Sequence, residues 1–147
     1  MKPVLAIGLG NPLMGDEGIG WHIAERLAAD PRLPEHVEVI CGGTDLIRYA
    51  GEMDGRSRVV LIDAIEDGSD TGTVTVFDGD FRGLEEHQEH AHHLSAIEAV
   101  GLLRLIVPTG FTLLGISISS ARLEPALSPS MAARLPEILE QVLENLA

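Results

Sequence analysis

The stretch PVLAIGLGNPLMGDEGIGWHIAERLAA, residues 3–29, decides the fold class. Residues 3–8 form a continuous apolar run, which is typical of a strand buried on both faces inside a parallel sheet. A glycine-rich turn follows, and apolar residues then recur at helical spacing over residues 18–29, until Pro31 stops the pattern. The order strand, loop, helix predicts the first unit of an α/β domain.

The rest of the chain repeats this alternation of strands and helices. Two of the further strands alternate apolar with polar residues, as exposed or edge strands do, and two are nearly all apolar. The expected fold is a three-layer α/β sandwich, phosphorylase/hydrolase-like, in which helices flank a mostly parallel sheet. Further strands are expected at 36–41, 58–62, 72–77 and 111–118, further helices at 46–53, 94–106 and 135–146, and a polar His-rich loop at 78–91.

Length, charge and cysteine content limit the function. A chain of 147 residues most simply makes one domain, residues 1–147. The net charge of -13 has the wrong sign for binding phosphates, so nucleic acid and anionic membrane surfaces are poor partners. No stretch approaches the ~20 apolar residues of a membrane span. The single cysteine, Cys41, excludes an intrachain disulfide and indicates a reducing compartment, so a cytoplasmic location is expected.

The turn Gly8-Leu9-Gly10 after the first strand suggests a dinucleotide site, but the pattern is incomplete. Leu13 stands where the fingerprint G-x-G-x-x-G needs its third Gly. Asp16 and Glu17 would also repel a pyrophosphate, which needs exposed amides and no anions. The sequence therefore predicts no nucleotide cofactor.

Five polar residues are expected beyond the carboxyl ends of the strands, where doubly wound sheets bind their ligands. Asp16 and Glu17 lie in the first loop, Asp63 ends the third strand, and His92 and His93 immediately precede an expected helix. Two carboxylates and one imidazole from three separate loops could bind a divalent transition metal with positions left open for water or substrate.

Each of these residues also has a purely structural alternative. Asp16 could cap the first helix or interact with its dipole, and Glu17 could be a first-turn acid of that helix. Asp63 closes a buried strand, so it must be solvated in a crevice or hydrogen-bonded by loop amides. His92 and His93 belong to a run of His and acidic residues, and such a run is more often a solvated surface.

The other reactive side chains offer little for catalysis. His22 and His36 are expected on the surface, and Cys41 is expected to be a small buried hydrophobe with no evident base beside it. The Ser residues lack a G-x-S-x-G elbow, so covalent catalysis has no visible candidate. A hydrolase built on this chain would therefore be metal-assisted.

Five segments resemble, in order, the hydrogenase maturation proteases, the endopeptidases that remove the C-terminal extension from the large subunit of nickel-iron hydrogenases. The resemblance spans nearly the whole chain and implies an α/β sandwich around a largely parallel sheet. The combination of G-x-GN-x-x-x-x-DE-x-x-G with a strand-terminal D-A is more specific than either piece alone. The segments are LAIGLGNPLMGDEGIGWHIAERL at 5–27, GGT at 42–44, VVLIDAI at 59–65, HHLSAIEAVGLL at 92–103 and LEPALSP at 123–129.

The resemblance also implies a metal site. In that family a Glu of the first loop, an Asp ending a central strand and a His before a helix bind a metal that represents the nickel of the incoming substrate. By motif these residues look like Glu17, Asp63 and His92, with His93 as the alternative to His92. One departure is Cys41, which stands before the double Gly where the family commonly has Asp.

The expected function is removal of the C-terminal extension from a hydrogenase large-subunit precursor after nickel insertion. The resemblance implies an aspartic-type or metal-dependent peptidase in which Glu17, Asp63 and His92 are both the catalytic and the metal-binding residues. The nickel would arrive on the precursor and act either as a recognition element or as a Lewis acid. The alternative is a non-catalytic nickel-binding chaperone or carrier, which the acidic charge and the His-rich loop suggest.

Overall fold

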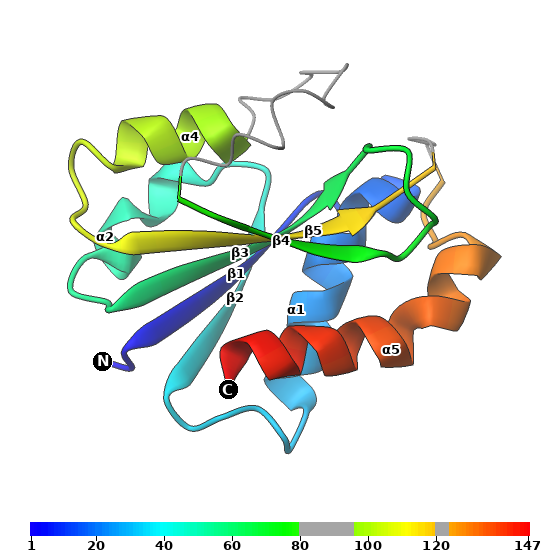
Figure 1. The fold of residues 1–147 in the computed structure, drawn as a ribbon, viewed down its shortest axis with the longest axis horizontal. Helices are drawn as coiled ribbons and strands as arrows, with labels where there is room; N and C mark the ends of the chain where they lie inside the picture. The colour runs from blue at the N-terminus through cyan, green and yellow to red at the C-terminus, as the bar shows by residue number, and fades with distance from the viewer. Residues whose placement is uncertain (80–95, 120–123) are drawn as a thin grey trace.

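The computed structural model describes residues 1–79, 96–119 and 124–147 of the chain. Five strands form one sheet in the order β2-β1-β3-β5-β4 (Figure 1). β2, β1, β3 and β5 pair in parallel, and β4 joins β5 antiparallel at one edge. The strands are β1 (Val4–Leu9), β2 (Val37–Gly43), β3 (Arg58–Ile65), β4 (Val74–Asp78) and β5 (Gly110–Ser117).

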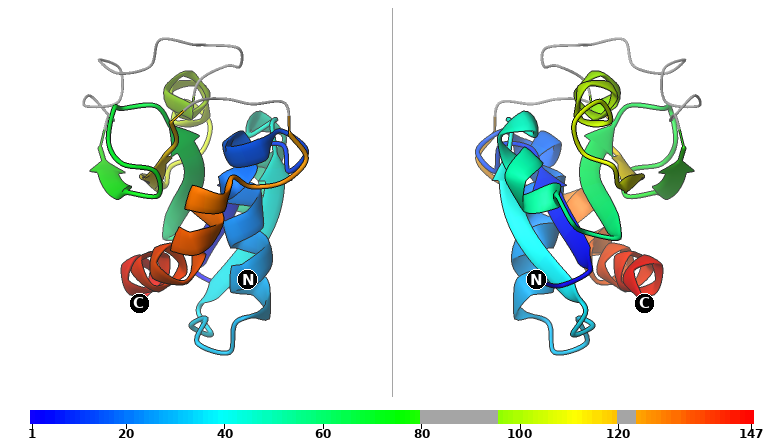
Figure 2. Two further views of the ribbon diagram at one scale, coloured as in Figure 1. Left: turned by 90° about the vertical axis from the view of Figure 1, so that its right-hand side faces the viewer. Right: turned by 90° about the vertical axis from the view of Figure 1, so that its left-hand side faces the viewer.

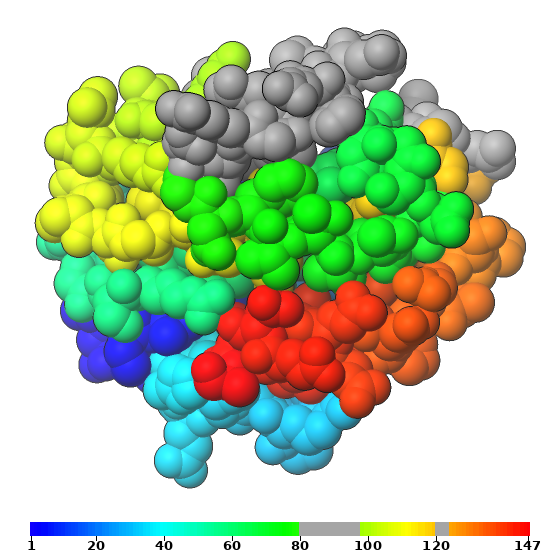
Figure 3. All heavy atoms as spheres, in the orientation of Figure 1, coloured from blue at the N-terminus to red at the C-terminus, as the bar shows by residue number. Residues whose placement is uncertain are grey.

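Helices cover both faces of the sheet, which confirms the expected three-layer α/β sandwich (Figure 1). The α1 and α5 helices pack on one face, and α2 and α4 pack on the other. At one edge of the sheet, β4 is exposed on the surface beside α5 (Figure 3). The helical elements are η1 (Gly15–Gly18), α1 (Ile19–Ala29), η2 (Ile47–Tyr49), α2 (Ala50–Met53), α4 (Ala96–Leu103) and α5 (Pro129–Leu146).

Burial on both faces explains why β1 reads as a continuous apolar run. Ala6 belongs to the apolar cluster between the sheet and the α1 and α5 helices. Leu5 and Ile7 belong to the cluster on the opposite face, beneath α2 and α4. Successive side chains of a strand point to opposite faces of the sheet. A strand between two helical layers is covered on both faces, so its residues are apolar throughout.

The strand that carries Asp63 is longer than expected. The sequence predicts that it ends at Asp63, whereas β3 continues to Ile65. Pairing with β5 extends it, because Asp63 lies opposite Gly115 and Ile65 lies opposite Ser117. Asp63 is thus inside a central parallel strand, near its carboxyl end.

The helices also differ from expectation at their ends. The last helix begins at Pro129 and not at residue 135, because Ser128 caps it by accepting a hydrogen bond from the Met131 backbone N–H at 3.2 Å. The helix expected over 46–53 is a 3-10 turn followed by a single α-helical turn. The described part of α4 ends at Leu103, three residues before the expected end.

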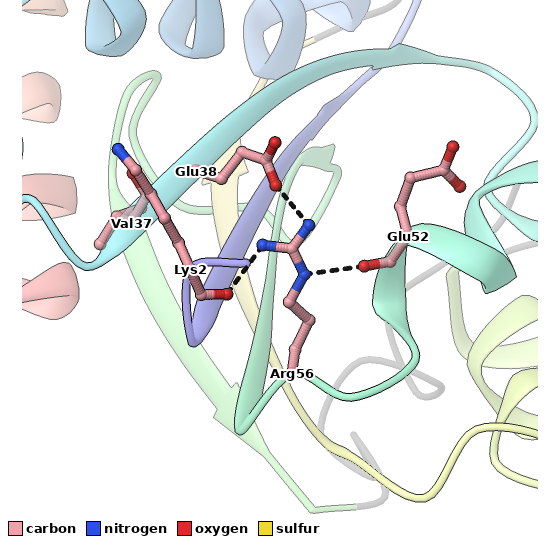
Figure 4. Close-up of polar contacts among 5 residues, drawn as sticks. All are labelled: Lys2, Val37, Glu38, Glu52 and Arg56. Carbon is pink, nitrogen blue, oxygen red and sulfur yellow. Dashed lines mark hydrogen bonds and ion pairs between the residues drawn. The ribbon is translucent and has the colours of Figure 1, made fainter.

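Arg56 connects three segments at the amino end of the sheet, opposite the carboxyl edge. Its guanidinium donates to the carbonyl oxygens of Lys2 and Glu52, each at 2.8 Å, and to the carboxylate of Glu38 (Figure 4). The Arg56 side chain is 7% exposed, whereas that of Glu38 is 46% exposed. The buried arginine therefore joins the starts of β1, β2 and β3 through backbone acceptors as well as through charge.

We expect Arg56→Met to lower the free energy of unfolding by about 1–3 kcal/mol, because two backbone carbonyls lose their donor. Urea unfolding followed by circular dichroism measures this change. Arg32→Met is the matched control, since the Arg32 side chain is 58% exposed in its ion pair with Asp30 and its loss should leave the stability nearly unchanged. Equal stability losses in the two variants would contradict the role of Arg56.

Within the described ranges, none of the helices has the length and apolar character needed to cross a bilayer.

Candidate functional site

Close backbone contacts at two glycines hold α1 against the carboxyl edge of the sheet. Gly8 of β1 lies against the carbonyl group of Gly20 in α1. Gly20 in turn lies against the carbonyl oxygens of Leu9 and Ile62, and a Cβ placed there would be 2.9 Å from the Leu9 backbone nitrogen. A side chain at either glycine would overlap the opposing backbone. These glycines therefore serve close packing of helix on sheet.

The first loop is ordered by its own hydrogen bonds. The Asn11 side-chain oxygen accepts from the Leu13 backbone N–H at 2.9 Å, and the Asn11 carbonyl accepts from Met14 at 3.0 Å. The Gly10 N–H donates to the carbonyl of Gly43 at 2.8 Å, which ties the loop to the end of β2. This loop leads into η1, the short turn that contains Asp16 and Glu17.

The structure brings Glu17 and Asp63 together at this edge. Leu61 and Ile65 of β3 belong to the cluster beneath α2 and α4, and Asp63 falls on the same face by alternation. The pKa of Asp63 is raised to about 7, chiefly by burial; the 2.8 Å hydrogen bond from the Ala64 N–H lowers it, and the negative charge of Glu17 raises it. Two partly buried carboxylates that repel one another form an arrangement that a proton or a cation would stabilise.

Asp16 does not cap the first helix, so the capping alternative is wrong. Its carboxylate accepts from the Ser128 backbone N–H at 2.8 Å and from the Ser128 hydroxyl at 2.7 Å. Gly18, the N-cap of α1, makes no side-chain cap hydrogen bond. Figure 2 shows the segment that leads into α5 running beside the first loop. The Asp16 carboxylate is therefore bonded to the start of α5 and not to the first amides of α1.

Ser128 is the residue near the site that the residue-by-residue sequence analysis missed. It lies in the segment LEPALSP, which is one of the five segments that carry the family resemblance. Nothing in local periodicity connects it with Asp16, because the two residues are 112 positions apart.

His92 and His93 lie outside the described residues, so their position relative to Glu17 and Asp63 stays a prediction. The α4 helix follows them, and it packs through Ala99, Val100 and Leu103 on the face of the sheet to which Asp63 belongs. Within residues 1–79, 96–119 and 124–147, no group of three His, Cys, Asp or Glu side chains could hold a metal ion.

Cys41 is partly buried on β2, and its thiol lies 4.0 Å from the carbonyl oxygen of Trp21. Burial raises the pKa of this thiol, and the negative charge of Glu25 raises it further. A raised pKa disfavours the thiolate form that nucleophilic catalysis requires.

Two further histidines were expected on the surface. His36 is exposed, and its Nε2 lies 3.1 Å from the carbonyl oxygen of Leu146, with which it forms a hydrogen bond. His22 is partly buried, and within the described part of the chain its buried Nε2 has no hydrogen-bond partner. The expectation is confirmed for His36 and is wrong for His22.

Comparison with protein families gives one matching model, described as hydrogenase maturation protease, over residues 21–145. Among curated proteins, the Hydrogenase 2 maturation protease of Escherichia coli is 32% identical over 147 residues, which cover 97% of this chain and 90% of that protein. The hydrogenase expression/formation protein HupD of Rhodobacter capsulatus is 28% identical, over 97% of this chain and 70% of its own length.

Known structures show the same similarity. The hydrogenase maturating endopeptidase HybD from E. coli superposes with a TM-score of 0.81 at 31% identity, covering 97% of this chain and 91% of that one. The NiFe hydrogenase maturation protease HybD from Thermococcus kodakarensis gives a TM-score of 0.80 at 28% identity, covering 98% and 99% of the two chains.

Proposed function

Because this chain belongs to the hydrogenase maturation protease family, we propose that it removes the C-terminal extension of a nickel-iron hydrogenase large-subunit precursor after nickel insertion. The observation that supports this site most directly is the pairing of Glu17 and Asp63 at the carboxyl edge of the sheet. Ligands of doubly wound sheets bind at this edge, because the loops diverge there.

Nickel is part of the substrate in this proposal. Carboxylate oxygens and an imidazole nitrogen are suitable donors for a divalent transition metal, and Glu17, Asp63 and His92 would supply them. The chain contains one cysteine, so the thiolate ligands of the nickel come from the precursor. Burial chiefly, and the charge of Glu17 in addition, raise the pKa of Asp63, and a divalent cation between Glu17 and Asp63 would offset both effects.

The nickel acts as a recognition element that positions the scissile bond. When Glu17, Asp63 and His92 occupy the coordination positions left free by the precursor, the adjacent peptide is held at a fixed place on the enzyme. Hydrolysis then adds one water: its oxygen bonds to the carbonyl carbon, the bond between that carbon and the peptide nitrogen breaks, and a proton passes to the leaving nitrogen. Each carboxylate has two oxygens, so one can bind nickel while the other accepts a proton from the water.

The test is incubation with a nickel-loaded precursor and with the same precursor free of nickel, followed by mass spectrometry. We expect the loaded precursor to lose its C-terminal extension and the nickel-free precursor to stay intact. Comparable cleavage of both would contradict the recognition role of nickel. Tight stoichiometric nickel binding without cleavage of any precursor would instead support a carrier.

The pH dependence follows from the position of Asp63. Its proton must leave before the carboxylate can bind nickel, so we expect single-turnover processing to increase as the pH rises through about 7. The rate is measured by mass spectrometry between about pH 5.5 and about pH 8.5. A rate that does not change across this range would contradict the assignment of Asp63.

For the free protein we expect the opposite trend in stability, measured as the free energy of unfolding by urea at several pH values. The pKa of Asp63 is higher in the folded chain than its ordinary value of 3.8, so the folded state keeps a proton that the unfolded state releases. The contribution of Asp63 to stability is therefore fully present below pH 3.8 and is lost as the pH rises to about 7. The control is Asp63→Asn, whose free energy of unfolding should lack this component and exceed that of the wild type at neutral pH.

A further inference from the structure

A hydrogen-bonded pair, the buried Asp16 and the partly buried Ser128, lies beside the candidate site. From its geometry we infer that Asp16 is a positioning residue, which holds Glu17 in place by tying η1 to the first turn of α5. The inference rests on the proposed function, in which Glu17 binds the nickel of the substrate. It assigns to the start of α5 a role in a site that is otherwise built from the first loop and β3.

Both the backbone N–H and the hydroxyl of Ser128 form hydrogen bonds with Asp16. One oxygen of Asp16 accepts from the Ser128 N–H at 2.8 Å and the other accepts from its hydroxyl at 2.7 Å. The same hydroxyl accepts from the Met131 N–H at 3.2 Å, so it caps α5 while it donates to Asp16. Asp16 is only 9% exposed, and its bonds are therefore little weakened by competition with water.

The backbone of η1 is held from two sides. On the side of the sheet, Gly10 packs against the carbonyl of Glu17, and Gly18 packs against the backbone of Asn11. On the side of α5, the carboxylate of Asp16 supplies the bonds to Ser128. Glu17 follows Asp16 directly, and within the described ranges its own carboxylate has no hydrogen bond that would orient it. Its position therefore depends on the backbone that Asp16 anchors.

The geometry favours a positioning role for Asp16 over direct participation in the reaction. Both of its oxygens already accept hydrogen bonds from Ser128, which belongs to a different element from Asp63. A ligand or a catalytic base needs a carboxylate oxygen that faces the substrate.

The test compares Asp16→Ala, Ser128→Ala and the double variant in single- and multiple-turnover processing of a nickel-loaded precursor. Each single variant should lower kcat about 10- to 100-fold and change KM less than about 3-fold. The double variant should be no slower than Asp16→Ala, because Asp16→Ala already removes both hydrogen bonds to Ser128, whereas Ser128→Ala removes the hydroxyl bond and keeps the backbone N–H. Additive losses, or a loss confined to KM, would overturn the inference.

Asp16→Asn is the conservative rescue. Its amide oxygen can still accept from the Ser128 N–H, and its amide nitrogen can donate to the Ser128 hydroxyl. We expect it to retain kcat within about 5-fold of the wild type. A loss as large as that of Asp16→Ala would mean that the charge of Asp16 acts directly, and it would overturn the positioning role.

Thr112→Val is the matched structural control. The Thr112 hydroxyl donates to the Asp78 carboxylate at 2.8 Å, and Thr112 is 5% exposed, so the variant also removes a partly buried hydrogen bond between a hydroxyl and a carboxylate. Thr112 lies three positions along β5 from Gly115, the partner of Asp63, toward the amino end. We expect Thr112→Val to lower Tm while kcat stays within about 2-fold of the wild type.

Hydrogen exchange separates failure of the inference from failure of the proposed function. If the wild type cleaves no precursor, the proposed function fails, yet exchange in the free proteins still tests the connection. Amides of residues 10–19 should exchange faster in Asp16→Ala and Ser128→Ala than in the wild type, with no such change in Thr112→Val. Unchanged exchange over residues 10–19 in both site variants would overturn the inference.

Discussion

Asp63→Ala and Glu17→Ala are each expected to lower processing of a nickel-loaded precursor by at least about 10³-fold, because each removes one of two carboxylates that the nickel would contact. The domain should remain folded, since neither side chain supports the core. Single-turnover mass spectrometry measures processing, and circular dichroism measures folding. Wild-type rates in both variants would contradict the site.

The matched control is Glu52→Ala. The Glu52 side chain is exposed at the amino end of the sheet, and its backbone carbonyl accepts a hydrogen bond from Arg56. We expect its processing rate to equal that of the wild type, which would show that the losses do not follow from a change in net charge. A large loss in Glu52→Ala would contradict the assignment of the effect to the carboxyl edge.

The same assay identifies the third ligand. Of His92→Ala and His93→Ala, only the variant that lacks the ligand should process as slowly as Asp63→Ala. The Glu17→Ala and Asp63→Ala effects should also combine less than additively, because residues that hold one substrate group act as a unit. Full activity in both histidine variants would exclude this doublet from the site.

Gly20→Ala is expected to lower the free energy of unfolding by at least about 3 kcal/mol. The added Cβ would overlap the carbonyl oxygens of Ile62 and Leu9 and lie 2.9 Å from the Leu9 nitrogen. All three are backbone atoms of central strands, so α1 must move away from the sheet. Denaturant unfolding measures the loss, and the displaced η1 should reduce processing as well.

Gly51→Ala provides the comparison for Gly20. Gly51 lies in α2, and a Cβ there would have no heavy atom within 4 Å among the described residues. Alanine is the better helix former by about 1 kcal/mol, so this variant should be as stable as the wild type or slightly more stable. Equal losses at Gly20 and Gly51 would contradict the close-packing explanation.

Much of the fold could be predicted because the pattern of apolar residues along the sequence follows which side chains are buried. The unbroken apolar run of β1 and the apolar residues of α1 at helical spacing are both set by which faces are covered. The ends of the strands and helices were harder to predict from the sequence. β3 extends past Asp63 because of its pairing with β5, and α5 starts early because Ser128 caps it.

Part of the candidate site could also be predicted from the sequence, and part of it could not. The position of Glu17 in the first loop and of Asp63 near a strand end follows from motif and topology, because parallel strands present their carboxyl ends at one edge. The roles of the neighbouring residues do not follow from local pattern. Asp16 resembles a helix cap by its spacing, yet its carboxylate accepts hydrogen bonds from Ser128.

The sequence by itself determined the α/β class, the edge of the sheet at which Glu17 and Asp63 gather, and, through the order of its motifs, the family. Only the tertiary structure decided that Asp16 binds Ser128, and that Gly8 and Gly20 bring helix and sheet into backbone contact. The physical reason is the range of the interaction. Periodicity records whether a residue faces the core, whereas a hydrogen bond across 112 positions depends on how remote segments pack.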